Sequence, residues 1–521
     1  MKTLEIITRQ LIKDKPETRK NLADAKRQTA GKFKLPPPLS ADIFRIYQKL
    51  LRRKKIKRDE RLELLLKKRE VRTISGVAPV AVLTKFYPCP GKCSYCPTEK
   101  NMPKSYLSNE PAVMRAIANN FDPFRQVTQR LRALDNNGHN TNKIELIIMG
   151  GSWSSLPITY QKNFIKKCFD AANGKKSSNI EQAQKINETA KHRLVAITVE
   201  TRPDLINEKN ITLWRQLGVT KVEMGVQILD DEILKKNCRG HGIFETIKAT
   251  QLLRSAGFKI CYHLMPNLPF SNPDKDLETF VKMYSQPDFR PDFIKIYPTV
   301  VTKGTQLYKL WQNKKYKPYS NETLIDLLLK IKILTPEYVR IIRLIRDIPA
   351  ESSSAGNLVS NLREILQKKL HELNLKCHCI RCREAREDLT NIKKAKLFTT
   401  EYFVTGGTEI FLQYASPDRN KLYAFLRLFL PTERKNHFLK ELKGSAIIRE
   451  VHTYGKVSSF YKKSKDIQHH GFGTLLTNKA IEISKKYNYK KLSVISGVGV
   501  RGFYRKLKFK KDGTYMSINS L

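Results

Sequence analysis

The stretch "GVAPVAVLTKFYPCPGKCSYCPTEK" (76–100) joins an apolar, strand-like run to a loop that holds three cysteines. They are Cys89, Cys93 and Cys96, spaced C-x3-C-x2-C. A structural zinc site closes its shell with four ligands, and the nearest histidine in the sequence is His139. Three thiolates on a [4Fe–4S] cluster instead leave one iron open to a substrate group. The spacing therefore favours such a cluster over a zinc knuckle completed from a distant ligand.

Beyond residue 75, short apolar runs rich in β-branched residues alternate with longer helical patterns. Six such runs lie at 76–85, 144–151, 194–200, 221–227, 259–265 and 292–298. Six β-then-α units in a row indicate a parallel sheet, and right-handed crossovers curl it into an open barrel. We therefore expect an α/β fold whose main domain is a partial (βα)6 barrel.

Polar and glycine residues gather where these strands are expected to end. The cysteine loop follows the first strand, and the later strands end at Gly150-Gly151, "ETRPD" (200–204), Gln227, "MPNLP" (265–269) and "YPT" (297–299). Active sites of β/α barrels lie at the carboxyl ends of the strands. The pattern predicts that these residues surround one site.

The pattern of apolar residues changes toward the C-terminus. From about 401 the runs "EYFVTGG", "EIFLQYA", "KLYAFLRLFL" and "SAIIREVHTYGKV" suggest an antiparallel sheet, followed by a helix, the strand "KLSVIS" (491–496), and a closing helix and strand. We expect four regions: a basic helical extension (1–70), the barrel (71–305), a helical linker with a cysteine-rich site (306–390) and an α/β domain (391–521).

A second motif, "QHHGFGTLL" (468–476), lies between a strand and an apolar-periodic helix. Q-x-x-G-x-G at such a turn offers free backbone N–H groups at the positive end of a helix, which suits a pyrophosphate. The motif resembles motif A of the GNAT acetyltransferases, where it holds coenzyme A. That resemblance assigns acetyl-CoA contacts to Gln468, Gly471, Phe472, Gly473 and Thr474, and to the splayed strand residues Glu450, Val451, His452 and Thr453.

The same resemblance places Tyr504 near the thioester sulfur, although a packed aromatic residue is the alternative for this position. No general base is evident from the sequence. Glu450 and His452 are the candidates, so Tyr504, His452 and Glu450 form the expected catalytic set.

A third motif, "CHCIRC", contains Cys377, Cys379 and Cys382. This spacing is short enough for the three thiolates to bind one Zn²⁺, which would stabilise the linker against the C-terminal domain. His371, His378 and His452 are candidates for the fourth ligand, and a second iron–sulfur cluster is the rival interpretation.

The chain of 521 residues carries 97 Lys and Arg against 49 Asp and Glu, a net charge of +48. Such an excess points to a polyanionic partner, although a general lysine bias of the source organism would also produce it. The first 20 residues lack the apolar core of a secretory signal, and no apolar run reaches about 18 residues. We therefore expect a cytoplasmic protein with no membrane partner.

The C-x3-C-x2-C loop in front of six βα units resembles the radical S-adenosylmethionine enzymes, and a barrel of that kind followed by an acetyltransferase-like domain is a rare pair. From about residue 71 the chain resembles the Elongator catalytic subunit in its stand-alone archaeal or bacterial form, over motifs that include "SYLSNEPAVMRA", "ITVETRPD", "KIYPTVVTKGTQLYKLW", "IREVHTYG" and "VISGVGVRGFYRKL". The resemblance implies carboxymethylation of the wobble uridine of tRNA. Acetyl-CoA would supply two carbons, and S-adenosylmethionine would supply a radical that activates the acetyl methyl group.

The resemblance also implies roles for single residues. Gly150 and Gly151 would contact the methionine moiety of S-adenosylmethionine, Glu200 and Gln227 would complete that cofactor site, and Lys143 would meet acetyl-CoA. tRNA would be gripped through its body and its anticodon stem-loop. Accessory Elongator subunits are optional for a stand-alone form, and the electron donor is unassigned.

Two departures from the family pattern concern hydroxyl groups. Gly-Gly-Thr reads Gly150-Gly151-Ser152 here, and Asn-Tyr-Tyr reads Gly502-Phe503-Tyr504, which leaves one tyrosine of two. Two other functions compete: a protein lysine acetyltransferase with a structural cluster, and a non-catalytic tRNA-binding scaffold. The basic composition opposes the first, because a cationic substrate favours an acidic groove, and the intact motifs oppose the second.

Overall fold

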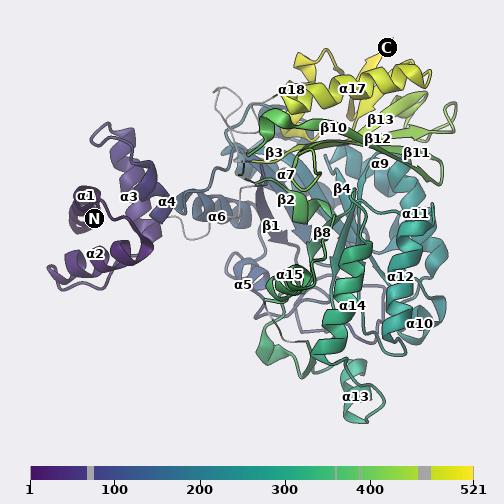
Figure 1. Ribbon diagram of the computed structural model, residues 1–521, viewed down its shortest axis with the longest axis horizontal. Coiled ribbons are helices and arrows are strands. Elements are labelled where there is room, and N and C mark those ends of the chain that lie inside the picture. The colour runs from purple at the N-terminus through teal and green to yellow at the C-terminus, as the bar shows by residue number, and fades with distance from the viewer. Residues whose placement is uncertain are drawn as a thin grey trace.

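The computed structural model describes residues 2–66, 75–357, 359, 361–386, 388, 390–455, 471–519 and 521. Figure 1 shows a helical extension at the N-terminus, a barrel-like central domain and a C-terminal sheet domain that lies against the barrel. Among the described helices, none combines the length and the apolarity needed to cross a bilayer.

The N-terminal extension contains α1 (Lys2–Asp14), α2 (Arg19–Gly31), α3 (Ser40–Arg52) and α4 (Glu60–Leu66). These helices stand apart from the two sheets in Figure 1. They bury a small core of their own, in which Ile43, Tyr47 and Leu62 are at most 2% exposed. The expected helical extension is confirmed over these residues.

The central domain is built on a parallel sheet of seven strands in the order β1-β2-β3-β4-β5-β6-β8. The strands are β1 (Ala78–Leu83), β2 (Lys143–Met149), β3 (Arg193–Thr201), β4 (Lys221–Gln227), β5 (Lys259–Leu264), β6 (Phe293–Ile296) and β8 (Arg340–Arg343). The six expected strands are all present. The seventh lies in the region that the sequence assigned to a helical linker, so that assignment was wrong there.

The short strand β8 escaped the sequence analysis for a physical reason. "RIIR" has only four residues, and two of them are arginines. Ile341 supplies the apolar contact, while Arg340 faces Glu384 and Tyr454 instead of solvent. Because β8 pairs with β6 through Phe293 and Arg340, the barrel sheet extends well past residue 305.

Helices lie around the barrel sheet (Figure 1). This part of the chain contains α5 (Pro111–Ile117), α6 (Pro123–Asn136), α7 (Ile158–Asn173), α8 (Ile180–Asn187), α9 (Glu208–Gln216), α10 (Asp231–Lys236), α11 (Ile243–Ser255), α12 (Pro273–Ser285), α13 (Gln306–Gln312), α14 (Asn321–Leu334), α15 (Leu362–Glu372) and α16 (Ile380–Arg383). Helix α13 projects away from the sheet at the bottom of the view (Figure 1). A two-stranded ribbon of β7 (Val300–Val301) and β9 (Ala355–Gly356) lies after β6.

The C-terminal domain is a seven-stranded sheet in the order β10-β11-β12-β13-β14-β16-β15. Its elements are β10 (Lys396–Val404), β11 (Gly407–Ala415), β12 (Leu422–Pro431), β13 (Ser445–Thr453), α17 (Phe472–Lys486), β14 (Lys491–Val494), α18 (Arg501–Lys506), β15 (Lys510–Asp512) and β16 (Tyr515–Asn519). Among the strand pairs that the structure describes in this sheet, only β13–β14 is parallel, so the expected antiparallel sheet with one helical crossover is confirmed.

The C-terminal sheet buries both faces. Leu412, Leu426 and Ile448 pack with α17, whereas the alternate residues Phe411, Phe425 and Ile447 belong to the same apolar core as the barrel. A Cβ added at Gly497 would lie 2.0 Å from the carbonyl oxygen of Val195, near the start of β3. The two domains therefore share one continuous core and pack backbone against backbone.

Candidate active site

The cysteine loop lies directly after β1 and lines a cavity of about 760 Å³. The backbone N–H of Gly91 donates to Cys89 Sγ at 3.4 Å, and Arg239 Nη1 donates to Cys93 Sγ at 3.4 Å. Burial and the neighbouring Cys93 raise the pKa of Cys96 to about 11. Burial opposes ionisation of this thiol, whereas donors directed at sulfur and a bound metal group favour the thiolate form.

The sulfur positions distinguish a single ion from a cluster. Thiolates on one Zn²⁺ bind at about 2.3 Å and must lie close together. Among the described residues, Cys377, Cys379 and Cys382 form such a group, with all sulfurs within 4.8 Å of one another, whereas the cysteines of the 89–96 loop do not. The wider spacing of Cys89, Cys93 and Cys96 fits thiolates that bind separate iron atoms, as in a [4Fe–4S] cluster.

The glycine pair after β2 lies beside the cysteine loop. Gly150 has a φ of +134°, and a Cβ there would lie 2.0 Å from Thr84 Oγ1. Gly151 has a φ of +86° and lines the cavity, and Ser152 Oγ lies 3.5 Å from Cys89 Sγ. The position of Gly150 excludes any side chain, and the pair brings bare backbone next to the expected cluster.

Glu200 and Gln227 reach the same cavity from the ends of β3 and β4. Tyr106 donates its hydroxyl hydrogen to Glu200 Oε2 at 2.6 Å. Gln227 adopts a φ of +75°, and its buried Oε1 accepts no hydrogen bond from the described residues. A buried acceptor at a cavity wall is a place for a ligand donor, so both residues fit the expected cofactor site.

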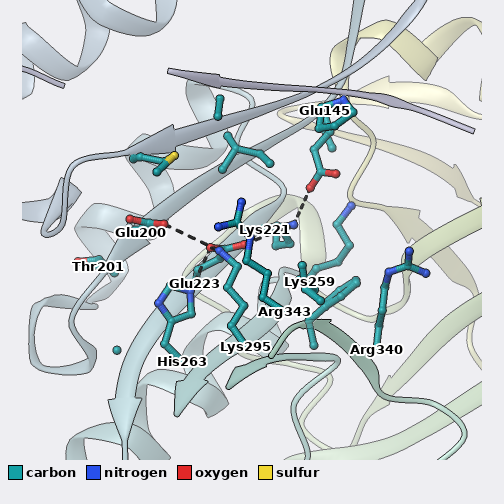
Figure 2. Close-up of a pocket in the computed structure, with 18 of the residues that line it drawn as sticks. Glu145, Glu200, Thr201, Lys221, Glu223, Lys259, His263, Lys295, Arg340 and Arg343 are labelled. Carbon is teal, nitrogen blue, oxygen red and sulfur yellow. Dashed lines mark hydrogen bonds and ion pairs between the residues drawn. The ribbon is translucent and has the colours of Figure 1, made fainter. Parts of the chain in front are cut away.

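A chain of buried charges crosses the barrel interior (Figure 2). Glu223 contacts Lys295, lies 3.1 Å from His263 Nε2 and lies 3.6 Å from Lys221 Nζ, which in turn donates to Glu145 at 2.5 Å. Burial opposes ionisation, yet these cations hold the pKa of Glu223 well below its ordinary value. Paired, buried charges therefore line the barrel interior between the amino and carboxyl edges of the sheet.

Strand β13 opens away from β14, as the sequence predicted. The two strands pair only from Ser445 to Ile448, while Glu450 to Thr453 pair with β12 on the other side. The β12–β13 register shifts between Arg427 and Leu428, which leaves Arg449 as a bulged residue. The β14-facing edge of Glu450–Thr453 consequently borders the cavity.

Helix α17 points its N-terminus at this opening. Gly471 is the N-cap, with a φ of +75°, and Gly473 and Thr474 line the cavity. Phe472 turns into the core, where its ring lies 4.7 Å from that of Tyr414. The first-turn N–H groups and the helix dipole favour an anion here. Gln468 lies outside the described residues.

The three expected catalytic residues meet at the same opening. Glu450 Oε2 accepts from Arg427 Nε at 3.0 Å, and His452 Nε2 lies 2.7 Å from the carbonyl oxygen of Ser75, so Nε2 carries the hydrogen. Burial lowers the pKa of His452. Burial and the charge of Glu450 raise the pKa of Tyr504 well above its ordinary value, so its hydroxyl stays protonated at neutral pH.

Lys143 connects the barrel with the acetyltransferase-like side. It begins β2 and lines the cavity, where burial and the charge of Arg193 lower its pKa to about 8. The cavity therefore runs from the carboxyl edge of the barrel sheet, at Cys89, to the amino edge, at Lys143. It continues to Tyr504 in the C-terminal domain.

The second cysteine group is compact and buried. Cys377 and Cys379 are 8% and 0% exposed, and Lys332 Nζ donates to Cys382 Sγ at 3.4 Å. None of the candidate histidines His371, His378 and His452 has a ring nitrogen within 4.8 Å of all three sulfurs. The sequence analysis missed Lys332, which lies in the apolar run "LIDLLLKIKIL" and is fully buried in the structure.

Basic side chains near the cluster loop were also missed. Arg239 contacts Cys93, and Arg346 Nη2 lies 3.2 Å from Glu110 while its guanidinium lies 5.2 Å from the ring centroid of Tyr106. Both line the cavity. Arg239 follows α10, and Arg346 follows β8, a strand that the sequence analysis did not identify, so neither arginine stood out among the many basic residues of the chain.

Comparisons with known proteins agree with this geometry. Residues 85–283 match the Radical SAM superfamily, and residues 291–372 match the Radical_SAM C-terminal domain. The chain is 45% identical over 468 residues to the tRNA uridine(34) acetyltransferase of Methanocaldococcus jannaschii, covering 87% of this chain and 86% of that protein. It is 35% identical over 540 residues to Elongator complex protein 3 of Homo sapiens, covering 99% and 96% of the two chains.

A solved structure gives the same result. The archaeal Methanocaldococcus infernus Elp3, with an N-terminal deletion of residues 1–46, superposes with a TM-score of 0.74 at 40% identity. The match covers 86% of this chain and 100% of that one. The expected resemblance is confirmed, and the chain belongs to the radical SAM family that contains the tRNA uridine(34) acetyltransferases and Elongator complex protein 3.

Proposed function

We propose that the protein modifies the wobble uridine of tRNA, uridine 34, and forms 5-carboxymethyluridine with two carbons from acetyl-CoA. One observation carries the proposal: a single cavity is lined by the cysteine loop at one end and by Glu450, His452 and Tyr504 at the other. The names of close relatives, tRNA uridine(34) acetyltransferase, support the same substrate.

The radical end belongs to a family that uses a [4Fe–4S] cluster and S-adenosylmethionine. Cys89, Cys93 and Cys96 would hold the cluster, and the residues that would hold S-adenosylmethionine are Gly150, Gly151, Glu200 and Gln227. When bound, the pair supplies a carbon radical strong enough to abstract hydrogen from a methyl group. Arg239 holds positive charge beside Cys93, and the buried barrel wall keeps bulk water away.

At the other end the residues suit acetyl-CoA. The open edge of Glu450–Thr453 offers backbone groups to the pantetheine amides, and the N-terminus of α17 offers N–H groups to the pyrophosphate. Hydrolysis of the thioester requires a base for water and an acid for the leaving thiolate. Glu450 or His452 accepts the proton from water, and the protonated hydroxyl of Tyr504 donates to sulfur.

The basic extension fits tRNA. Arg52, Arg53, Lys54 and Lys55, at the C-terminal end of α3 and directly after it, are exposed, in a chain of net charge +48. Clustered cations bind phosphates and carry no sequence information, so they would grip the tRNA body while one base enters the cavity. A Zn²⁺ on Cys377, Cys379 and Cys382 would stabilise the seam between the domains.

The test is nucleoside mass spectrometry on the anaerobically reconstituted protein with tRNA, S-adenosylmethionine, a reductant and acetyl-CoA carrying two ¹³C atoms. The expected product is carboxymethyluridine heavier by two mass units, absent in Cys96→Ser and present in the control Cys168→Ser, a buried cysteine of α7. Release of 5′-deoxyadenosine with unmodified tRNA would overturn the substrate or the carbon donor. A fully loaded protein that forms neither would leave only a binding role.

A further inference from the structure

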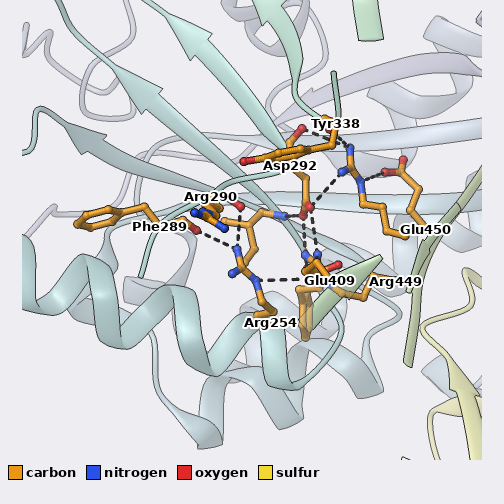
Figure 3. Close-up of polar contacts among 11 residues, drawn as sticks. Arg254, Phe289, Arg290, Asp292, Tyr338, Glu409, Arg449 and Glu450 are labelled. Atoms are coloured by element: carbon orange, nitrogen blue, oxygen red, sulfur yellow. Dashed lines mark hydrogen bonds and ion pairs between the residues drawn. The ribbon is translucent and has the colours of Figure 1, made fainter. Parts of the chain in front are cut away.

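Six charged side chains meet where the C-terminal sheet rests on the barrel (Figure 3). Three are arginines and three are carboxylates, and none has a side chain more than 8% exposed: Arg254 and Asp292 from the barrel, and Glu409, Arg427, Arg449 and Glu450 from the C-terminal sheet. We call this set the interdomain charge cluster. Buried ions are costly unless fully paired, so such a set is retained where it fixes geometry.

Asp292, just before β6, is the fixed point of the cluster. Arg449 donates to its two oxygens at 3.0 and 2.5 Å, and the backbone N–H of Ile260 donates to Oδ2 at 2.8 Å. Three donors hold both carboxylate oxygens in place. The charged arginines lower the pKa of Asp292 despite its burial, so it remains an anion.

Arg427 connects this point to the candidate catalytic group. Its Nη2 donates to the carbonyl oxygen of Tyr338 at 2.7 Å, and its Nη1 lies 3.5 Å from Asp292 Oδ1. Its Nε donates to Glu450 Oε2 at 3.0 Å. The rings of Phe293 and Phe411 lie 5.6 and 5.3 Å from the guanidinium, which leaves the planar group little freedom.

The bulge in β13 makes this arrangement possible. In a regular strand Arg449 and Glu450 would face opposite sides of the sheet. Because the register shifts at Arg427, Arg449 reaches Asp292 while the next residue, Glu450, also reaches Arg427 and the cavity. Bulges next to active sites redirect side chains in this way.

We propose that Asp292 and Arg427 are positioning residues that set the carboxylate of Glu450 through the docking of the two domains. A group of the radical domain thereby fixes a group that acts on acetyl-CoA. The inference rests on the proposed function, because it assumes that Glu450 takes part in the chemistry of acetyl-CoA. The cluster would otherwise serve only to hold the domains together.

A double-mutant cycle separates the two roles. The rates are single-turnover formation of labelled carboxymethyluridine by the reconstituted full-length enzyme, in Arg427→Lys, Asp292→Asn, Glu450→Gln and the paired variants. Lysine keeps the charge of Arg427 but cannot contact all three partners at once. The matched control is Glu409→Gln, which removes a carboxylate from the same cluster. Glu409 contacts Arg449 and Arg254.

We expect Arg427→Lys and Asp292→Asn to lower the rate at saturating acetyl-CoA by about 10-fold or more. The acetyl-CoA concentration for half-maximal rate, and 5′-deoxyadenosine formation without acetyl-CoA, should stay within about twofold. In the Glu450→Gln background, neither substitution should slow the reaction further. Glu409→Gln should lower the thermal midpoint and leave the rate within about twofold.

If Arg427→Lys or Asp292→Asn lowers the rate equally with and without Glu450→Gln, the proposal is overturned and the cluster only holds the domains together. An equal loss of rate in Glu409→Gln would lead to the same conclusion. A Glu450→Gln enzyme with full activity would overturn it as well, and would remove Glu450 from the proposed function while leaving the tRNA product intact. Where Asp292→Asn does not fold, as judged by thermal unfolding, the Arg427→Lys arm of the cycle decides.

Discussion

The two ends of the cavity are built in different ways. At the radical end, Cys89, Gly151, Glu200 and Gln227 all lie at or just after the carboxyl ends of strands of one parallel sheet, so a single domain places them. At the acetyl end, Glu450 depends on Arg427 and Asp292, and His452 contacts Ser75 from a segment about 380 residues earlier in the chain. One end is set by strand order, and the other by the docking of two domains.

This difference implies that the ends respond separately to mutation. Changes at the radical end should remove the chemistry of S-adenosylmethionine and spare acetyl-CoA binding. Changes that affect Glu450 or Tyr504 should slow formation of the modified nucleoside and spare 5′-deoxyadenosine formation, whereas changes in the cysteine-rich segment between the domains should affect both ends.

The largest effect is expected at the radical end. Gly150→Ala places a methyl group 2.0 Å from Thr84 Oγ1 and forces alanine to a φ of +134°. We expect 5′-deoxyadenosine formation to fall by about 100-fold while the acetyl-CoA dissociation constant changes less than about twofold. Both are measurable on one preparation, by chromatography and by calorimetry.

Gly174→Ala is the matched control. Gly174 also has a positive φ, +72°, but it ends α7 in open space with no atom within 4 Å of a Cβ. Its substitution should cost about 1 kcal/mol of stability and no activity. A similar loss of activity in both variants would show that backbone strain, and not the cofactor site, causes the effect.

At the acetyl end, Tyr504→Phe removes a hydroxyl whose high pKa keeps it a donor. Formation of the modified nucleoside should slow by about 10-fold, and 5′-deoxyadenosine formation without acetyl-CoA should not change. Tyr489→Phe, which removes another buried hydroxyl of this domain, is the control and should affect stability alone. Full activity in Tyr504→Phe would mean that the residue is a packed aromatic.

The seam should affect both ends together. The cysteine-rich segment joins the domains through Ile380 N to Val339 O at 2.9 Å and Ala385 N to Leu422 O at 3.0 Å. Cys379→Ser, or removal of the proposed zinc by a chelator, should lower the thermal midpoint by about 5 °C or more. Both activities should then fall by a similar factor of about five at the growth temperature. Loss of one activity alone would refute a structural role for this site.

The smallest effect is a pH dependence at Lys143. Its pKa of about 8 means that it is charged below pH 8 and neutral above it. The affinity for acetyl-CoA, an anion, should therefore weaken by about threefold as pH rises through 8, and the affinity of Lys143→Met should be flat over this range. Lys185→Met, at an exposed position of α8, is the control and should keep the pH dependence of the affinity. An unchanged pH profile in Lys143→Met would place the titrating group elsewhere.

The radical end was largely predictable from the sequence. The six β-then-α units and the C-x3-C-x2-C spacing are local patterns, and strand ends at one edge of a parallel sheet converge by geometry alone. The splay of β13 and the helix at Phe472 followed from a local motif as well. The same reasoning failed at β8, because a four-residue strand with two arginines carries too little apolar periodicity.

The acetyl end and the seam depended on contacts between distant parts of the chain. Nothing near Glu450 in the sequence indicates that Arg427 and Asp292 hold it, because a one-residue bulge changes which side chains share a face. Lys332 likewise meets Cys382 only in the folded chain. Arginines that serve a buried cluster look the same in the sequence as arginines that bind RNA.

The shared core has a consequence for how such a protein can arise and change. Phe411, Phe425 and Ile447 cover barrel residues, so either half alone would expose a broad apolar face and risk aggregation. A recombination event that exchanged one half for a distant relative would also have to match the close backbone approach of Gly497 to Val195. The two domains should therefore be inherited as a unit, and their surfaces should diversify while the joint stays unchanged.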